Sequence, residues 1–490
     1  MLGLLAALAA VLAVEEVRTS RLQARHFAQL AKELQFRVEP GPSGEIRFPQ
    51  NGPFDERLGY SLLPRFVERL RAKEYAVDAQ ARLSPALLDL TGKGYFAPYQ
   101  EKSQAGLSIL DCSGEQMFSA RHPQRVYPRF EDIPPLAIET LLFIENRELL
   151  DAQYPTRNPA VEWTRLAKAV LSKAIRIFNA DYDVPGGSTL ATQIEKYRHS
   201  PEGITTTAAE KLRQMVSASL RAYRQGEQTL GSRRQLVLDY LNTVPLSALA
   251  GYGEVNGLGD GLWAWYGADF DEVNRLLVDA KLDRGDLRAQ ARAYRQTLAL
   301  MIAHRRPSYL LAHGRHQLDA LTERYLRLLG GAGVITPELR DLAMELRPPF
   351  RNPKAEPAVE PTFADKTASV VRGRLSSLLD LPVYSVDRLD LSVHSSINRE
   401  IQDTVTAFLR QLGDARYARS AGLTGERLLG DSSKAPKVYY SFTLFERDGD
   451  ANYVRVQTDN SDRPLDINEG TKLELGSTAK LRTLANYLEI

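Results

Sequence analysis

The pattern of hydrophobic and polar residues divides the 490-residue chain into stretches of clearly different character. The first is an unbroken apolar run from Leu2 to Val14, followed by a helix-like stretch to Leu34 that is rich in Arg, Lys and Gln. The run is shorter than the roughly 20 residues that a membrane-spanning helix needs, and it lacks the positive segment that begins a secretory signal. An anchor, a signal-like apolar region and a buried helix all fit it. We expect residues 1–34 to form an apolar anchor and a juxtamembrane helix.

Residues 35–125 mix one short helical pattern with several alternating runs. The run from Leu107 to Phe118 alternates on both sides of Ser113 and Gly114, which predicts a β-hairpin with its turn at this pair. We therefore expect a small α/β accessory region here.

From residue 126 to residue 346, apolar residues recur at helical spacing. The first clear helix runs from Pro135 to Ile144 and begins with proline, which is favoured in the first turn of a helix. Further helices are predicted at 163–177, 189–197, 208–224, 233–242, 294–304 and 316–329. This part is therefore predicted to be a mostly α-helical domain.

Five prolines fall between Arg347 and Pro361, which is typical of a linker, and we place this linker at residues 347–385. Beyond it, strand patterns at 389–394, 438–444 and 453–457 flank a helical pattern at 397–412. Residues 386–490 are thus predicted to begin an α+β domain. The apolar face of the helical pattern is predicted to consist of Ile401, Val405, Phe408 and Leu412.

Composition and charge narrow the possible functions. The net charge is +2 and a quarter of the residues are charged, so neither bulk nucleic-acid binding nor disorder is indicated. Cys112 is the only cysteine, which excludes a disulfide within the chain and a zinc site built from several thiolates. The seven histidines are widely spaced, and we expect most of them to be structural or surface residues.

Three segments contain residues that could carry chemistry. Glu145 ends the first predicted helix, and a carboxylate at the edge of an apolar run is a candidate general base; Glu148 competes with it. The segment Gly186–Lys196 places two glycines and a Ser-Thr pair before a helix, which is typical of an anion site at a helix N-terminus. A Tyr-Leu-Asn sequence at 240–242 precedes a glycine-rich stretch at 251–261 with nearby aromatic residues, predicted as a loop that either rims a binding site or packs.

The order of these segments resembles glycosyltransferase family 51, the peptidoglycan polymerases found in class A penicillin-binding proteins. The resemblance covers about 130 residues and rests on a series of short motifs. They are Glu145-Asn146, Arg165 in Trp163–Ala167, Gly186–Lys196, Lys211, Tyr240–Asn242 and Tyr266-Gly267. It implies a multidomain protein with a mostly α-helical, lysozyme-like glycosyltransferase domain at 126–346. The accessory region would precede this domain, and the start of an α+β transpeptidase domain would follow it.

The resemblance also implies a reaction. Glu145 would take the proton from a sugar hydroxyl, and undecaprenyl pyrophosphate would leave. The substrates would be lipid II and the growing glycan strand, at the outer surface of the bacterial inner membrane and in the company of other cell-wall synthesis proteins. A divalent cation, Mg²⁺ or Mn²⁺, is a candidate cofactor, although no metal cluster is visible in the sequence. The residues implied to bind the diphosphate are Arg165, Ser188, Thr189, Gln193, Lys196, Lys211 and Gln214.

A second resemblance lies near residue 490. Ser477 and Lys480 have the S-x-x-K spacing of the penicillin-binding transpeptidase, in which the serine is the acyl nucleophile. No S-D-N or K-T-G sequence follows Lys480 here. We therefore expect this domain to be incomplete in this sequence and unable to act as a transpeptidase.

The chain also departs from the family pattern close to the chemistry. Asn146 stands where the family has Asp, Leu149 where it has Phe, Thr192 where it has Gln and Gln214 where it has Glu. Glu210 lies one helical turn before Gln214 and is a candidate substitute for the lost carboxylate. Three functions stay open: an active polymerase, a pseudo-polymerase that binds glycan or cell-wall partners without turnover, and a lytic enzyme that cleaves finished glycan.

Overall fold

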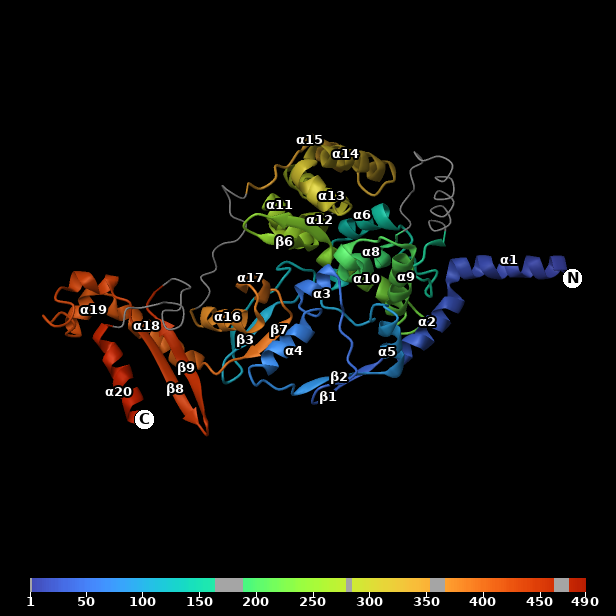
Figure 1. Ribbon diagram of the computed structural model, residues 1–490. Helices are drawn as coiled ribbons and strands as arrows, with labels where there is room; N and C mark the ends of the chain where they lie inside the picture. Colours follow the sequence, from blue (N-terminus) through green and yellow to red (C-terminus); the bar gives the residue numbers. More distant parts are fainter. Residues whose placement is uncertain (1, 164–187, 279–283, 353–365, 462–475) are drawn as a thin grey trace. The chain divides into compact units, whose positions relative to one another are not determined.

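The computed structural model describes residues 2–163, 188–278, 284–352, 366–461 and 476–490 (Figure 1). The chain divides into two compact units. Unit 1 comprises Met1–Ala105 and Arg121–Glu360, and unit 2 comprises Gly106–Ala120 and Pro361–Ile490. We describe each unit by itself.

The N-terminal part of unit 1 combines short helices with one antiparallel pair of strands. Its elements are α1 (Leu2–Thr19), α2 (Arg21–Glu33), β1 (Phe36–Pro40), α3 (Pro53–Arg57), α4 (Leu63–Arg71), β2 (Ala79–Leu83) and α5 (Pro85–Gly92). β1 pairs with β2, Phe36 opposite Leu83. Among the described helices, none has both the length and the apolar character needed to cross a bilayer.

The larger part of unit 1 is helical, as the apolar spacing predicts. Its helices are α6 (Pro135–Glu145), α8 (Leu190–His199), α9 (Ala208–Ala222), α10 (Leu230–Thr243), α11 (Gly257–Tyr266), α12 (Phe270–Val278), α13 (Arg284–Ala303), α14 (Arg315–Gly331) and α15 (Pro337–Glu345), with short turns η1 (Phe130–Asp132), η2 (Pro201–Gly203) and η3 (Tyr309–His313). α13 packs against α14 and α15 (Figure 1). One continuous hydrophobic core runs from Tyr127 to Ala343. Most of the predicted helix at 163–177 lies outside the described residues.

The glycine-rich stretch at 251–261 is not the loop that the sequence suggests. After the hairpin of β5 (Pro245–Leu249) and β6 (Gly253–Asn256), it enters α11 directly. Gly257 has a φ of +79°, and a Cβ atom there would lie 2.4 Å from the Asn242 carbonyl oxygen. A Cβ atom at Gly259 would lie 2.4 Å from the Arg125 carbonyl oxygen. The glycines are therefore needed because α11 packs backbone against backbone.

The segment before the helical body also differs from the expected accessory region. Residues up to Ala105 belong to the same compact unit as the helices. α2 buries Ala24 and Ala28, and Phe27 stacks on Tyr223 directly after α9, with ring centroids 6.1 Å apart. Apolar packing thus joins this segment to the helical body rather than leaving it as a separate domain.

Unit 2 contains the predicted hairpin of β3 (Leu107–Leu110) and β4 (Gln116–Ser119). β3 also pairs in parallel with β7 (Leu391–His394), so the hairpin belongs to a three-stranded sheet with a strand almost 300 residues later. The other elements are α16 (Lys366–Leu379), α17 (Val383–Val386), α18 (Arg399–Leu412), α19 (Ala415–Ser420), η4 (Ser432–Lys437), β8 (Ser441–Asp448), β9 (Ala451–Asp459), η5 (Gly476–Thr478) and α20 (Ala479–Glu489).

The apolar face predicted for α18 is not the face that the structure buries. Ile401 and Phe408 are 42% and 49% exposed, whereas Gln402 and Leu409 are buried. The Gln402 amide donates to the Gln457 carbonyl at 2.9 Å and accepts from the Gln457 N–H at 2.8 Å. An amide that satisfies both backbone groups of a strand residue can be buried at low cost, which apolar periodicity does not reveal.

Candidate active site

Glu145 is held at the end of α6 by the burial of that helix. Ala137, Leu141 and Ile144 pack into the core, so the last turn presents Glu145 at the edge of the apolar region. The Glu145 side chain is only 7% exposed. The competing Glu148 side chain is 66% exposed and forms an ion pair with Arg157 at 2.7 Å. The two carboxylates that the sequence left as alternatives therefore differ in burial: Glu145 is buried and Glu148 is exposed.

Two side chains from distant helices contact the Glu145 carboxylate. The Gln193 amide, on α8, donates to Glu145 Oε2 at 2.7 Å. His304 follows α13, and its Nε2 lies 3.5 Å from Glu145 Oε1. Each carboxylate oxygen thus has one neighbour, which fixes the plane of the group.

Two predicted site residues, Ser188 and Thr189, lie at the start of α8 and make different contacts there. Thr189 is the N-cap of α8: its hydroxyl accepts from the Thr192 N–H, and the Thr192 hydroxyl in turn accepts from the Thr189 N–H. Thr189 is 3% exposed, so the structure gives it a capping role in place of the predicted diphosphate contact. Ser188, one residue earlier, is only half-buried and accepts from Lys211 Nζ at 2.8 Å.

Lys196 and Lys211 bring two positive charges to this region. Burial and, to a smaller extent, the nearby Lys196 ammonium together lower the pKa of Lys211 to about 8. Burial also lowers the pKa of Lys196, whereas the Glu145 carboxylate acts in the opposite direction. Lys211 lines a pocket of about 480 Å³ together with the threonines at 205–207, Ala208, Leu212 and Met215. Lys211 thus presents an ammonium group to this pocket, and the nearby Lys196 adds a second positive charge that favours an anion.

Gln214 does not face this pocket. It is fully buried and its amide donates to Ser200 Oγ at 3.0 Å and to Thr205 Oγ1 at 2.8 Å. Glu210, the suggested substitute carboxylate, is also buried; it accepts from Ser200 Oγ at 2.5 Å and pairs with Arg213. The Gln214 amide thus completes an internal hydrogen-bond network, and its predicted contact with the diphosphate stays a prediction.

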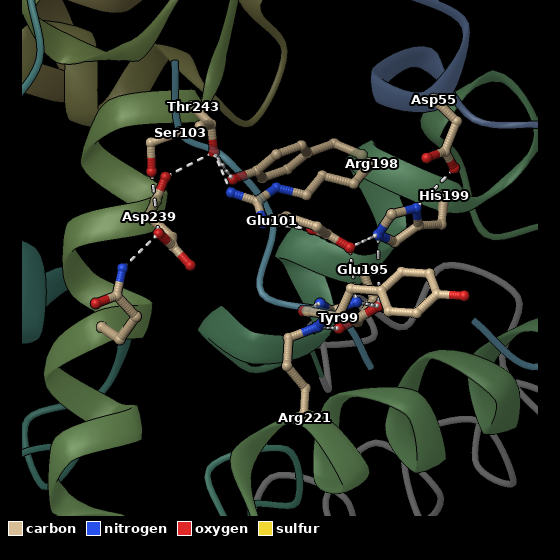
Figure 2. A network of polar contacts seen from close by, with 12 residues as sticks. Asp55, Tyr99, Glu101, Ser103, Glu195, Arg198, His199, Arg221, Asp239 and Thr243 are labelled. Atoms are coloured by element: carbon tan, nitrogen blue, oxygen red, sulfur yellow. Dashed lines mark hydrogen bonds and ion pairs between the residues drawn. The ribbon is translucent and has the colours of Figure 1, made fainter. Parts of the chain in front are cut away.

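A buried network of charges holds the opposite side of α8 (Figure 2). Glu101 lies at its centre and pairs with Arg198 at 2.6 Å, with His199 at 2.8 Å and with Arg221 at 2.8 Å. His199 also contacts Asp55 at 2.7 Å. Arg198 and His199 are on α8 together with Gln193 and Lys196, so the network anchors the helix that carries part of the site.

The geometry adds His304, which sequence reasoning missed, and places Tyr240 beside it. His304 was counted among the structural or surface histidines, and no local signal connects it with Glu145. Tyr240 belongs to the Tyr-Leu-Asn motif; within the described part of the chain its hydroxyl is buried and has no hydrogen-bond partner. Its ring lies edge-on to His304 with centroids 5.7 Å apart. Asn242 of the same motif is structural, since its amide bonds both backbone groups of Tyr127.

Three further residues were predicted to take part in catalysis or binding. Arg165 lies outside the described residues. Ser477 and Lys480 belong to unit 2, where both are exposed, on η5 and α20 respectively. The transpeptidase assignment stays a prediction.

The described residues offer no ready set of ligands for a metal ion. In the described ranges, no three His, Cys, Asp or Glu side chains come together in a way that could hold a metal ion. The described residues thus do not fit the divalent cation that the resemblance implies, and the positive charge at the site comes from Lys196 and Lys211.

Residues 113–325 match the protein family described as Transglycosylase. A comparison with curated proteins found no match. The matched segment includes Glu145, Gln193, Lys196, Lys211 and His304, which are the residues gathered around the site. Residues 113–325 are therefore similar to a transglycosylase domain.

Proposed function

We propose that the chain is a peptidoglycan glycosyltransferase that joins lipid-linked disaccharide-peptide units, lipid II, into glycan strands and releases undecaprenyl pyrophosphate. One observation carries the proposal. The buried Glu145 carboxylate is oriented by Gln193, and the same helix places Lys196 close enough to interact with it electrostatically. A base and a cation side by side are what an inverting transfer from a diphosphate requires.

In the proposed reaction, Glu145 acts on the acceptor sugar, and Lys196 and Lys211 act on the diphosphate that leaves. Glu145 accepts the proton of the acceptor sugar's 4-hydroxyl, and the freed oxygen attacks the anomeric carbon of the growing strand. The bond from that carbon to the diphosphate oxygen breaks with inversion. Lys196 and Lys211 stabilise the negative charge that develops on the diphosphate, with Ser188 beside Lys211. No step uses a metal ion.

The test is polymerisation of fluorescently labelled lipid II by the wild type and by Glu145→Gln. Loss of a general base is expected to lower the rate by a factor of about 10² or more. Glu148→Gln is the matched control, because Glu148 is only three residues away but exposed and paired with Arg157; its rate should stay within about twofold of the wild type. Equal, near-zero rates in the wild type and Glu145→Gln would contradict the proposal.

The second candidate function is a pseudo-polymerase that binds glycan without turnover. This candidate is supported by Gln214, a buried amide at a position where the family that the sequence resembles has a carboxylate. In that case the wild type would bind labelled lipid II and produce no strands. A lytic enzyme would instead release soluble fragments from finished murein sacculi, so incubation with sacculi distinguishes the third possibility.

We also propose that the protein works at the outer face of the bacterial inner membrane, because lipid II has a long lipid tail. In α1, Val11, Leu12 and Val14 are each more than half exposed, which is the exposure expected of side chains that contact lipid. Flotation with vesicles should show binding by the full chain. Binding should weaken when Val11, Leu12 and Val14 are all replaced by serine, and equal flotation would contradict this membrane contact.

A further inference from the structure

His304 lies directly after α13, and its side chain is only 9% exposed. Its two ring nitrogens face different groups. Nδ1 is 2.6 Å from the Met301 carbonyl oxygen, and Nε2 is 3.5 Å from Glu145 Oε1. His304 thus connects the backbone at the end of α13 with the carboxylate proposed as the base.

The Met301 contact determines where the imidazole carries its proton. A carbonyl oxygen can only accept a hydrogen bond, so Nδ1 must be the protonated nitrogen. In the neutral ring Nε2 then presents its lone pair toward Glu145 Oε1. A lone pair facing an ionised carboxylate is unfavourable in a buried site, whereas one proton between the two atoms makes the contact attractive.

We propose that Glu145 and His304 form a pair that takes up one proton during the reaction, with His304 as the positioning residue that receives it from Glu145. This inference rests on the proposed function. The proton leaves the acceptor hydroxyl for Glu145 and passes to His304 Nε2. The electrons of the O–H bond form the new glycosidic bond, and the electrons of the broken bond leave with the diphosphate. The imidazolium then returns the proton to solvent.

The surroundings of His304 favour a neutral resting ring. Burial lowers the pKa of His304, and the positive charges of Arg305 and Lys196 act in the same direction. The Glu145 carboxylate and the Met301 carbonyl act in the opposite direction. From α10, Tyr240 packs edge-on against the ring. A neutral Nε2 is the form that can accept a proton at neutral pH.

The first test measures the pair without measuring activity. Full-length protein labelled with ¹³C in its histidines is titrated by NMR, and the His304 signal is identified by its loss in His304→Gln. In Glu145→Gln the neighbouring negative charge is absent, so the pKa of His304 should fall by about one unit or more. An unchanged pKa of His304 would overturn the proposal whether or not the protein polymerises glycan. Because Glu145→Gln keeps His304 itself, this measurement stands even if a His304 variant folds poorly.

The second test is the pH–rate profile of polymerisation. In His304→Gln we expect kcat at pH 7 to fall about tenfold while KM stays within about twofold, because His304 acts through Glu145 and not on substrate binding. The acidic limb of the profile should move to lower pH, since protonation of the His304 ring, which would block proton transfer from Glu145, can no longer occur. His313→Gln, nine residues away and exposed, is the matched control and should keep the wild-type profile. A wild-type acidic limb in folded His304→Gln would contradict the pair, whereas an inactive wild type would contradict the proposed function instead.

Discussion

The Gln193 amide donates a 2.7 Å hydrogen bond to Glu145, a residue 48 positions earlier in the chain. The bond joins the last turn of α6 to the middle of α8 and orients one oxygen of the carboxylate. Because the partner is a neutral amide, it brings no second negative charge to this oxygen. The first prediction follows from this contact.

Replacing Gln193 by Glu should abolish the base at neutral pH. Two carboxylates at hydrogen-bond distance share a proton, so Glu145 would be occupied by that proton when the acceptor hydroxyl arrives. We expect the polymerisation rate at pH 7 to fall about 100-fold and to recover in part as the pH rises. Gln193→Met, which removes the hydrogen bond without adding a charge, should lose less and show no such recovery. A rate in Gln193→Glu that does not depend on pH would contradict this role.

Lys211 should make substrate binding sensitive to alkaline pH. Its pKa is lowered to about 8, so the ammonium is present below that pH and is lost above it. KM for lipid II should therefore rise as the pH passes through about 8. An arginine stays protonated throughout this range, so Lys211→Arg should keep KM constant up to about pH 10. If the two proteins show the same pH dependence of KM, Lys211 is not the group responsible.

The buried network around Glu101 should make stability depend on His199. Although burial alone would lower it, the carboxylates of Glu101 and Asp55 raise the pKa of His199 to about 10. A pKa raised above the ordinary value of 6.5 gives stability that is complete below pH 6.5 and is lost as the pH rises through about 10. The free energy of unfolding should therefore fall between these two pH values, and His199→Gln should remove most of that slope.

Tryptophan fluorescence during urea unfolding can follow this change, because all three tryptophans of the chain, Trp163, Trp263 and Trp265, lie in unit 1. His313→Gln is the control, since His313 is exposed and should leave the slope as it is. A His199→Gln protein that keeps the wild-type slope would show that another group titrates in this range.

Two glycines close to each other allow a matched test of the packing of α11. At Gly257 an added Cβ would meet the Asn242 carbonyl at 2.4 Å, and the φ of +79° adds strain. At Gly251 the φ is +80° but no atom lies within 4 Å of the added Cβ. We expect Gly251→Ala to cost about 1 kcal/mol and Gly257→Ala to cost roughly 3 kcal/mol or more. Equal losses in urea unfolding would mean that the close approach adds nothing to the strain.

Local patterns predicted the helices of unit 1 well. α6, α8, α9, α10 and α14 begin and end within a few residues of the positions indicated by apolar spacing. The failures arise from contacts between residues far apart in the chain. The buried face of α18 does not coincide with its apolar face, because Gln402 is buried by hydrogen bonds to Gln457. The glycine-rich stretch was read as a loop because close packing of α11 on other backbone cannot be seen from composition.

The sequence by itself determined the order of the chemical groups: Glu145 at a helix end, then Gln193 and Lys196 one turn apart, then Lys211. Helical periodicity and short motifs depend on neighbouring residues, so they can be read along the chain. Only the tertiary structure decided that Glu145 is buried and Glu148 is not, that Gln214 faces inward, and that His304 contacts Glu145. Those outcomes depend on contacts between residues far apart in the chain, whose burial and hydrogen bonding are set only when the helices pack.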